Sequence, residues 1–187
     1  MPPIAKITRE MIIDAGFELV REYGMEHVNA RAISKKLNCS TQPVMYHFKT
    51  IEQIKKEIYQ KADKYHSSYI TDIQENNPML SIGLAYIRFA KTEKHLFRLL
   101  FQSNEFDGKS IYELIDSEEL EPIIKVLSET ANVNITRAKT IFSSLFIFVH
   151  GYASMFANNS LEYDEELISK DLKRIFTGMM YAAKDEL

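Results

Sequence analysis

Cysteine and tryptophan are the scarcest residues in this sequence, with Cys39 as its one cysteine and no tryptophan at all. A single cysteine cannot form an intramolecular disulfide, so nothing in the composition indicates an oxidising compartment. Glycine and proline are also rare, with six and five in 187 residues, while 45% of the chain is hydrophobic. Sheets of many strands need frequent turns, so this composition favours long helices. We therefore expect an all-α fold.

Long hydrophobic runs are missing as well. The longest apolar stretch, residues 144–157, is interrupted by His150 and is shorter than the roughly 20 residues that cross a bilayer. No basic and then apolar leader opens the sequence. We expect a soluble, cytoplasmic protein that has no membrane partner.

Motifs for catalysis, cofactors and metals are absent from the sequence. It contains no nucleophile elbow, no phosphate-binding glycine loop and no paired Cys/His ligand set. His95 and His150 lack a histidine partner four residues away, so neither predicts a metal site. We expect no cofactor and no bound metal, and an enzyme is the least favoured class of function.

Charge is unevenly distributed along the chain, although its net value is only −3. Residues 1–65 carry eleven Lys/Arg against eight Asp/Glu, whereas residues 66–187 carry twelve against eighteen. Any polyanionic partner is therefore expected on the N-terminal side. An ordinary solvated surface would also explain this modest excess.

Capping residues and apolar periodicity predict four helices in the first 75 residues, three short and one long. They cover residues 8–23, 30–37, 41–47 and 50 to about 74. Gly24 ends the first helix, and Asn38 suits the left-handed backbone of a tight turn after the second. The long helix is expected to connect the two halves of the protein.

The remainder of the chain reads as six further helices, near 79–92, 94–103, 110–116, 119–131, 135–158 and 163–185. The last two have apolar stripes wide enough to bury two faces. We therefore expect a homodimer in which these helices pair in antiparallel fashion across a two-fold axis. The residues predicted for this interface are Phe148, Tyr152, Leu172, Phe176, Met179 and Met180.

The short turn between helices 30–37 and 41–47 is typical of a helix-turn-helix, whose helices must cross closely at a steep angle. Small or apolar residues fit the inside of such a bend, namely Ile33, Cys39, Val44 and Phe48. The second helix then presents polar and aromatic side chains that could reach base edges and phosphates. Many helical hairpins contain such turns, so this pattern alone is not specific.

The stretch from Ile12 to Ile58 resembles the N-terminal domain of the tetracycline-repressor (TetR) family in order and spacing. The resemblance lies in IIDAGFELVREYG, ARAISKKL, NCSTQPVMYHF and KTIEQIKKEI. It implies a homodimeric, ligand-responsive repressor that binds palindromic double-stranded operator DNA. The sequence departs from the family pattern at Asn38, where glycine is usual, and at Val44-Met45, where an aliphatic residue and a tyrosine are usual.

Carried over position by position, the resemblance implies DNA contacts at nine residues: Asn29, Arg31, Thr41, Gln42, Pro43, Met45, Tyr46, His47 and Lys49. Of these, Tyr46, His47 and Lys49 would bind phosphates. Side-chain chemistry agrees, because Gln42 can pair with adenine while Thr41 and Pro43 can pack on thymine methyl groups. Alternatively, Arg31 is a solvated helix charge and Tyr46 a half-buried core residue.

Two C-terminal stretches, YIRFAKTEKHLFRLLFQSN and FSSLFIFVHGYASMF, resemble a TetR subgroup with a Trp-His-Gly motif. This sequence keeps His150-Gly151 but has no tryptophan. Aromatic and soft side chains could line a cavity for an apolar or aromatic small molecule. The predicted lining is Tyr86, Phe89, Phe97, Phe101, Phe142, Phe146, His150 and Met155, for each of which an ordinary packed core is the alternative.

Together these patterns predict a helix-turn-helix domain over residues 1–49 and a helical-bundle domain for ligand binding and dimerisation over residues 50–187. The long helix from residue 50 packs on the first domain and connects it to the second. The main alternative function is a helical small-molecule-binding or protein-interaction module whose helix-turn-helix no longer binds DNA.

Overall fold

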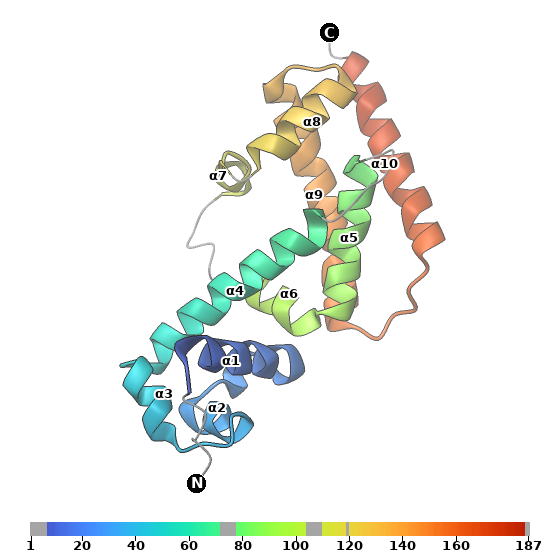
Figure 1. Cartoon of the computed structure of the whole chain (residues 1–187). Helices are drawn as coiled ribbons and strands as arrows, with labels where there is room; N and C mark the ends of the chain where they lie inside the picture. The colour runs from blue at the N-terminus through green and yellow to red at the C-terminus, as the bar shows by residue number, and fades with distance from the viewer. Residues whose placement is uncertain (1–6, 72–77, 104–109, 119, 186–187) are drawn as a thin grey trace. The chain divides into compact units, whose positions relative to one another are not determined.

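The computed structural model of the chain is all-helical, as predicted (Figure 1). It describes residues 7–71, 78–103, 110–118 and 120–185, which contain ten α-helices, one short 3-10 helix and no strand. The chain forms two compact units, Met1–Tyr69 with Thr92–Glu105 and Ile70–Lys91 with Phe106–Leu187. These units do not follow the predicted functional boundary at residue 50, which stays a prediction.

The first unit contains the N-terminal helices and one helix from the middle of the chain. Its elements are α1 (Arg9–Tyr23), η1 (Met25–His27), α2 (Ala30–Lys36), α3 (Thr41–His47), α4 (Ile51–Thr71) and α6 (Lys94–Phe101). Helix α4 belongs to this unit as far as Tyr69. Helix α1 packs against α2, α3 and α6. The first unit is therefore a small bundle built around α1.

Local capping explains where the first helices begin and end. Thr8 Oγ1 accepts the Met11 amide at 3.2 Å, and Asn29 Oδ1 accepts the Ala32 amide at 2.9 Å. Gly24 ends α1 with φ of 97°, a conformation that L side chains rarely adopt. These caps satisfy backbone groups that a helix terminus otherwise leaves without partners.

Helices α1 and α4 approach closely at Gly16. A β-carbon at this position would lie 2.4 Å from Ile58 Cδ1, and both Ile54 and Ile58 are fully buried. The predicted apolar stripe of the fourth helix thus packs on the N-terminal helices.

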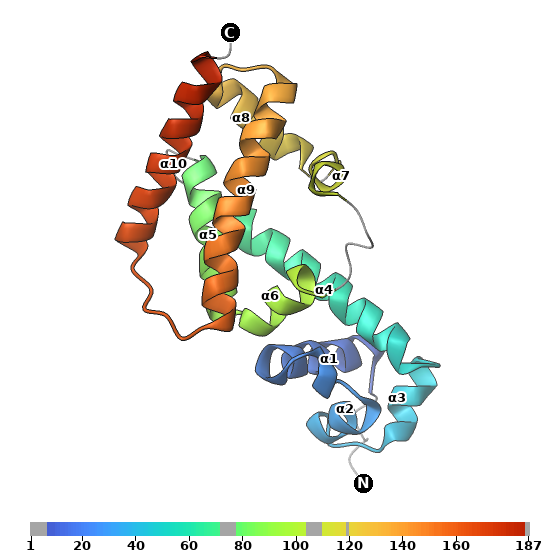
Figure 2. The same cartoon turned by 180° about the vertical axis from the view of Figure 1, so that it is seen from behind.

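The second unit contains α5 (Pro78–Thr92), α7 (Ile111–Ile115), α8 (Glu121–Ala131), α9 (Ile135–Asn158) and α10 (Glu165–Asp185). Helix α5 belongs to this unit as far as Lys91. Helix α9 contacts α7, α8 and α10. Its inward face supplies Ala138, Ile141, Phe142 and Leu145 to a core shared with α7 and α8. Figure 2 shows these helices from behind.

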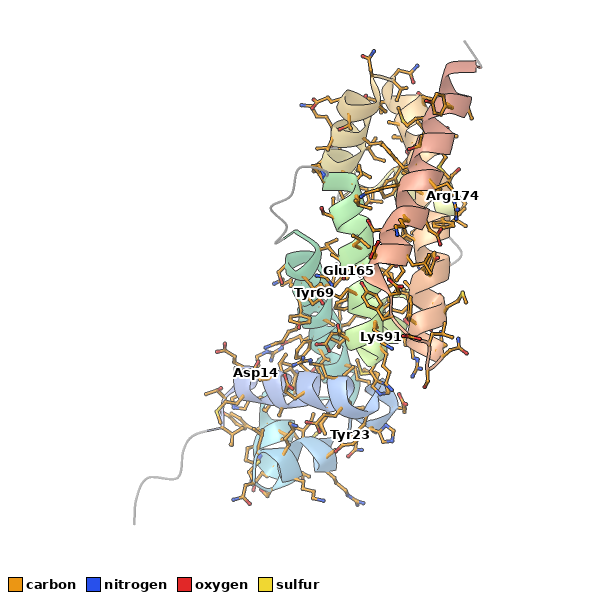
Figure 3. All side chains as sticks on the ribbon, turned by 90° about the vertical axis from the view of Figure 1, so that its right-hand side faces the viewer. Asp14, Tyr23, Tyr69, Lys91, Glu165 and Arg174 are labelled. Carbon is orange, nitrogen blue, oxygen red and sulfur yellow. The ribbon has the colours of Figure 1, made fainter. Side chains whose placement is uncertain are left out.

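Connections within the second unit are held by polar contacts. Arg88 on α5 donates to both carboxylate oxygens of Glu165, each at 2.8 Å. Lys91 Nζ donates to the Leu161 carbonyl at 2.8 Å. Lys91 and Glu165 are labelled in Figure 3. Through these contacts, the loop between α9 and α10 and the first residue of α10 bind to α5.

The predicted helices are all present, with small differences at their ends. The third and ninth helices have the predicted bounds, while the second ends at Lys36 because Leu37 is its cap. The 3-10 turn η1 was not predicted. The predicted end of the long helix near Gln74 lies outside the described residues, and α4 is described to Thr71.

Candidate nucleic-acid interface

The turn between α2 and α3 has the geometry that the sequence predicts. Asn38 adopts left-handed φ of 50°, and the Cys39 amide donates to the Ser34 carbonyl at 3.0 Å. Ile33, Val44 and Phe48 are fully buried on the inside of the bend, whereas Cys39 is half-buried. Buried apolar contacts therefore hold α2 and α3 together, as a helix-turn-helix requires.

Helix α3 turns most of its side chains outward. Thr41 and Gln42 are exposed, Met45 is 41% exposed, and Tyr46 is 83% exposed. Pro43 and His47 are half-buried. The exposure of Tyr46 excludes its alternative interpretation as a half-buried core residue. The helix thus offers a hydroxyl, an amide and a phenol to a partner.

The start of α2 contributes two further predicted residues, Asn29 and Arg31, which are both exposed. The Asn29 side chain is engaged locally, because it accepts from Ala32 and its Nδ2 donates to the His27 carbonyl at 3.3 Å. Its clearest role is to cap α2. The exposed Arg31 guanidinium can bind a phosphate group.

Lys49 precedes α4, and its backbone is fixed there. Its amide donates to Gln53 Oε1 at 3.0 Å, while the Gln53 amide donates to Thr50 Oγ1 at 3.3 Å. This reciprocal arrangement resembles a capping box and agrees with the predicted cap at Thr50. Lys49 itself is exposed, so its ammonium can bind an anion next to the end of α3.

The C-terminal end of α3 carries contacts that the sequence did not reveal. His47 Nε2 lies 2.9 Å from the Ile7 carbonyl oxygen, and Arg9 Nη1 donates to the His47 carbonyl at 3.0 Å. Arg9 also forms an ion pair with Glu57 on α4. The residues involved are about 40 positions apart, so periodicity could not have revealed these contacts.

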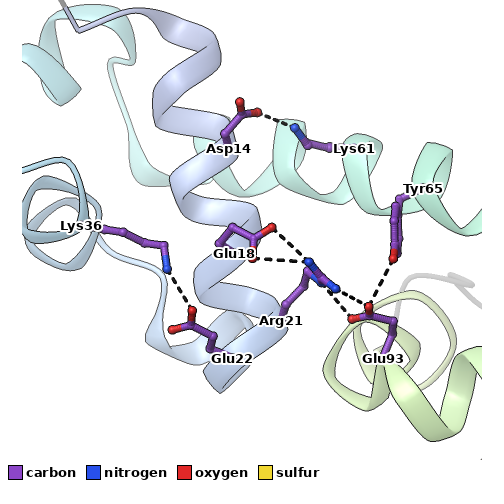
Figure 4. A network of polar contacts seen from close by, with 8 residues as sticks. All are labelled: Asp14, Glu18, Arg21, Glu22, Lys36, Lys61, Tyr65 and Glu93. Carbon is purple, nitrogen blue, oxygen red and sulfur yellow. Dashed lines mark hydrogen bonds and ion pairs between the residues drawn. The ribbon is translucent and has the colours of Figure 1, made fainter. Parts of the chain in front are cut away.

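A polar network joins α1, α4 and the start of α6 (Figure 4). Glu93 accepts from Arg21 through two hydrogen bonds, of 2.5 Å and 2.9 Å, and from the Tyr65 hydroxyl at 3.2 Å. The hydrogen bonds with Glu93 raise the pKa of the Arg21 guanidinium, which stays charged. Only 10% of the Glu93 side chain is exposed. This network attaches α6 to the two helices that support the helix-turn-helix.

The predicted ligand-binding residues divide between the two units. Phe97 and Phe101 lie on α6 in the first unit, where the Phe101 ring packs against buried His66 with centroids 4.9 Å apart. The second unit holds Tyr86, Phe89, Phe142, Phe146, His150 and Met155. Within this second set, Met155 is 54% exposed, while Phe89 is fully buried.

Four of these residues form one aromatic cluster in the second unit. The Phe146 ring lies 6.0 Å from Tyr86, 6.2 Å from Phe142 and 5.5 Å from His150, measured between centroids. The Tyr86 hydroxyl and His150 Nδ1 are 3.0 Å apart. Burial raises the pKa of Tyr86 and lowers that of His150, so both groups are neutral at pH 7. The cluster is apolar with one polar pair.

The predicted dimer residues lie on α9 and α10 but differ in exposure. Leu172 is 5% exposed, Phe176, Met179 and Met180 pack partly against the core of the second unit, and Phe148 and Tyr152 are half-buried. The Tyr152 hydroxyl donates to Asp171 at 2.5 Å. Two residues outside the predicted set are more accessible, Ile147 at 56% and Met155 at 54% exposed.

Helix α9 is also long and apolar enough to cross a membrane, judged by length and composition alone. Eight of its 24 residues are buried within the second unit, and one helix of this kind is weak evidence for a membrane span. Within the described ranges, no three His, Cys, Asp or Glu side chains gather as a metal site would require.

Comparison with known proteins gives one full-length similarity. The chain is 22% identical over 192 residues to a Bacillus subtilis (strain 168) protein named "Uncharacterized HTH-type transcriptional regulator YobS". The alignment covers 99% of each chain, so it includes both compact units. No family model matches the chain.

Proposed function

We propose that this protein is a DNA-binding transcriptional regulator whose α3 reads operator DNA. The observation that carries the proposal is the short helix α3, which is anchored by buried Val44 and presents exposed Thr41, Gln42 and Tyr46. The full-length similarity to a protein named as an HTH-type transcriptional regulator supports this class of function. The resemblance to the TetR family further suggests a cytoplasmic homodimeric repressor without enzymatic activity.

Operator recognition can be tested by selecting bound fragments from genomic DNA and then measuring variants on the selected site. Gln42→Ala should relax specificity at one base position, with a loss of about 1–3 kcal/mol of discrimination. Lys49→Ala should instead weaken binding to all sequences alike and flatten the salt dependence. Wild-type affinity in both variants would contradict the assignment, and a wild type that binds no DNA at low salt would favour the alternative of a helical module without DNA binding.

We further propose that an apolar or aromatic small molecule regulates DNA binding. The cluster of Tyr86, Phe142, Phe146 and His150 supports this class of ligand, because it combines ring surfaces with one neutral polar pair. Linkage requires reciprocity: a ligand that weakens DNA binding by a given factor binds the DNA complex more weakly by the same factor. Calorimetric titration of apolar aromatic compounds, with and without operator, measures the second factor, and titration of operator, with and without compound, measures the first. If none of these compounds shifts the melting temperature or the operator affinity, the apolar-ligand proposal fails.

A further inference from the structure

The recognition helix has few anchors of its own. Helix α3 has seven residues, and Val44 is the one that is buried. Among the described contacts, its N-cap Ser40 makes no side-chain capping hydrogen bond. Isolated helices shorter than about 12–15 residues are marginal in water. Contacts from elsewhere must therefore set the orientation of α3.

Arg9 supplies such contacts at the C-terminal end of α3. Its Nη1 donates to the His47 carbonyl at 3.0 Å, and its guanidinium carbon lies 4.1 Å from the centroid of the Phe48 ring. Its Nε donates to Glu57 Oε2 at 3.2 Å, and its Nη2 contacts the other carboxylate oxygen. One side chain thus joins the first turn of α1, the last turn of α3 and helix α4.

We propose that Arg9 is a positioning residue for operator recognition and that Glu57 holds it in place. This inference rests on the proposed DNA-binding function. The last carbonyls of a helix attract a cation, and the planar fork of arginine can serve a carbonyl and a carboxylate at the same time. A lysine ammonium provides the same charge without this fixed geometry.

Direct phosphate binding by Arg9 is the competing role, since its side chain is 53% exposed. The two roles predict opposite effects for Glu57→Gln. Removing a negative charge near bound DNA should strengthen binding if only charge matters. Releasing Arg9 from its carboxylate should weaken operator binding if positioning matters. Glu10→Gln is the matched control, because Glu10 is an exposed carboxylate next to Arg9 in the chain.

The decisive measurement compares operator with nonspecific DNA for Glu57→Gln and Arg9→Lys. We expect both variants to lose about tenfold in operator affinity, the effect of losing one charge-assisted hydrogen bond, with little change on nonspecific DNA. Glu10→Gln should not lose operator affinity. Unchanged operator affinity in Arg9→Lys, or tighter binding in Glu57→Gln, would overturn the proposal.

Hydrogen exchange in the free protein separates failure of this inference from failure of the proposed function. In both variants the α3 amides, including the Phe48 amide that donates to Val44 at 3.2 Å, should exchange faster than in wild type. Unchanged exchange would overturn the positioning role even if DNA binds. Faster exchange in variants of a protein that binds no DNA would instead contradict the proposed function, while it would still support the contact of Arg9 with α3.

Discussion

At the scale of single residues, the helix-turn-helix separates side chains that hold the fold from side chains that face outward. Ile33, Val44 and Phe48 are fully buried, whereas Gln42 and Tyr46 project from α3. An amide side chain costs free energy when it is buried without a hydrogen-bond partner. The amide of Gln42 is exposed instead, so it keeps its hydrogen-bonding groups available to a partner. Sequence-specific contacts to base edges require exposed polar side chains on a helix that is held in a fixed position.

His66 is a buried titratable residue on α4 and predicts a pH-dependent stability. Burial lowers its pKa from an ordinary value of 6.5 to about 4. The unfolded chain therefore binds a proton more readily, and the contribution of His66 to stability, present above pH 6.5, is lost as pH falls towards 4. The expected loss is about 3 kcal/mol in the free energy of unfolding.

This dependence can be isolated with His66→Phe, which keeps a ring against Phe101 but cannot titrate. Urea unfolding between pH 4 and 7 should show a shallower pH dependence in this variant than in wild type. The control is His27→Gln, because the His27 side chain is 59% exposed. Identical pH profiles for wild type and His66→Phe would show that His66 does not contribute.

At the scale of elements, α6 is attached to the helices that support the helix-turn-helix. Glu93 at its N-cap binds Arg21 of α1 and Tyr65 of α4. This network therefore holds the N-terminus of α6 within the first unit.

Glu93→Gln should weaken the attachment of α6 to α1. It removes the charge of a carboxylate that is 10% exposed, but solvent screens Arg21, which is 34% exposed. We therefore expect a loss of only about 1 kcal/mol in the free energy of unfolding, with faster hydrogen exchange in α6. Glu18→Gln is the control, since Glu18 binds the same arginine from within α1 and is 44% exposed. Equal effects of both substitutions would argue against a special role for Glu93.

At the scale of the whole molecule, the proposed homodimer accounts for an accessible face of α9. Ile147, Gly151 and Met155 follow one another at intervals of four residues and are all exposed. A β-carbon at Gly151 would meet nothing within 4 Å in its own chain, although glycine inside a helix costs about 0.5–1 kcal/mol relative to alanine. Close approach of a partner helix would explain this glycine.

Gly151→Leu and Ile147→Glu should therefore weaken dimerisation while leaving the helical content unchanged. Analytical ultracentrifugation at micromolar concentration should show a dimer for wild type and a shift towards monomer for both variants. Glu129→Leu is the control, because it places an exposed leucine on α8 instead. A monomeric wild type, or variants that dimerise as well as wild type, would count against this interface.

The sequence alone determined the all-α fold, the helix positions and four exposed side chains of α3, whereas Pro43 and His47, predicted in the same outward-facing set, are half-buried. Caps such as Thr8 and Asn29 and stripes such as Ile54 and Ile58 act over a few residues, so local periodicity is enough to recognise them. Where the structure describes the helix ends, the predicted ends differ from them by at most two residues, because fraying and 3-10 turns blur each terminus.

Only the tertiary structure decided which distant residues meet. It placed Phe97 and Phe101 in a different compact unit from Tyr86 and Phe146, and it brought Arg21 to Glu93, 72 residues away. Such contacts depend on how helix faces pack rather than on spacing along the chain. The same holds for Arg9, whose sequence neighbours predict only the first turn of a helix, whereas packing brings it to the end of α3.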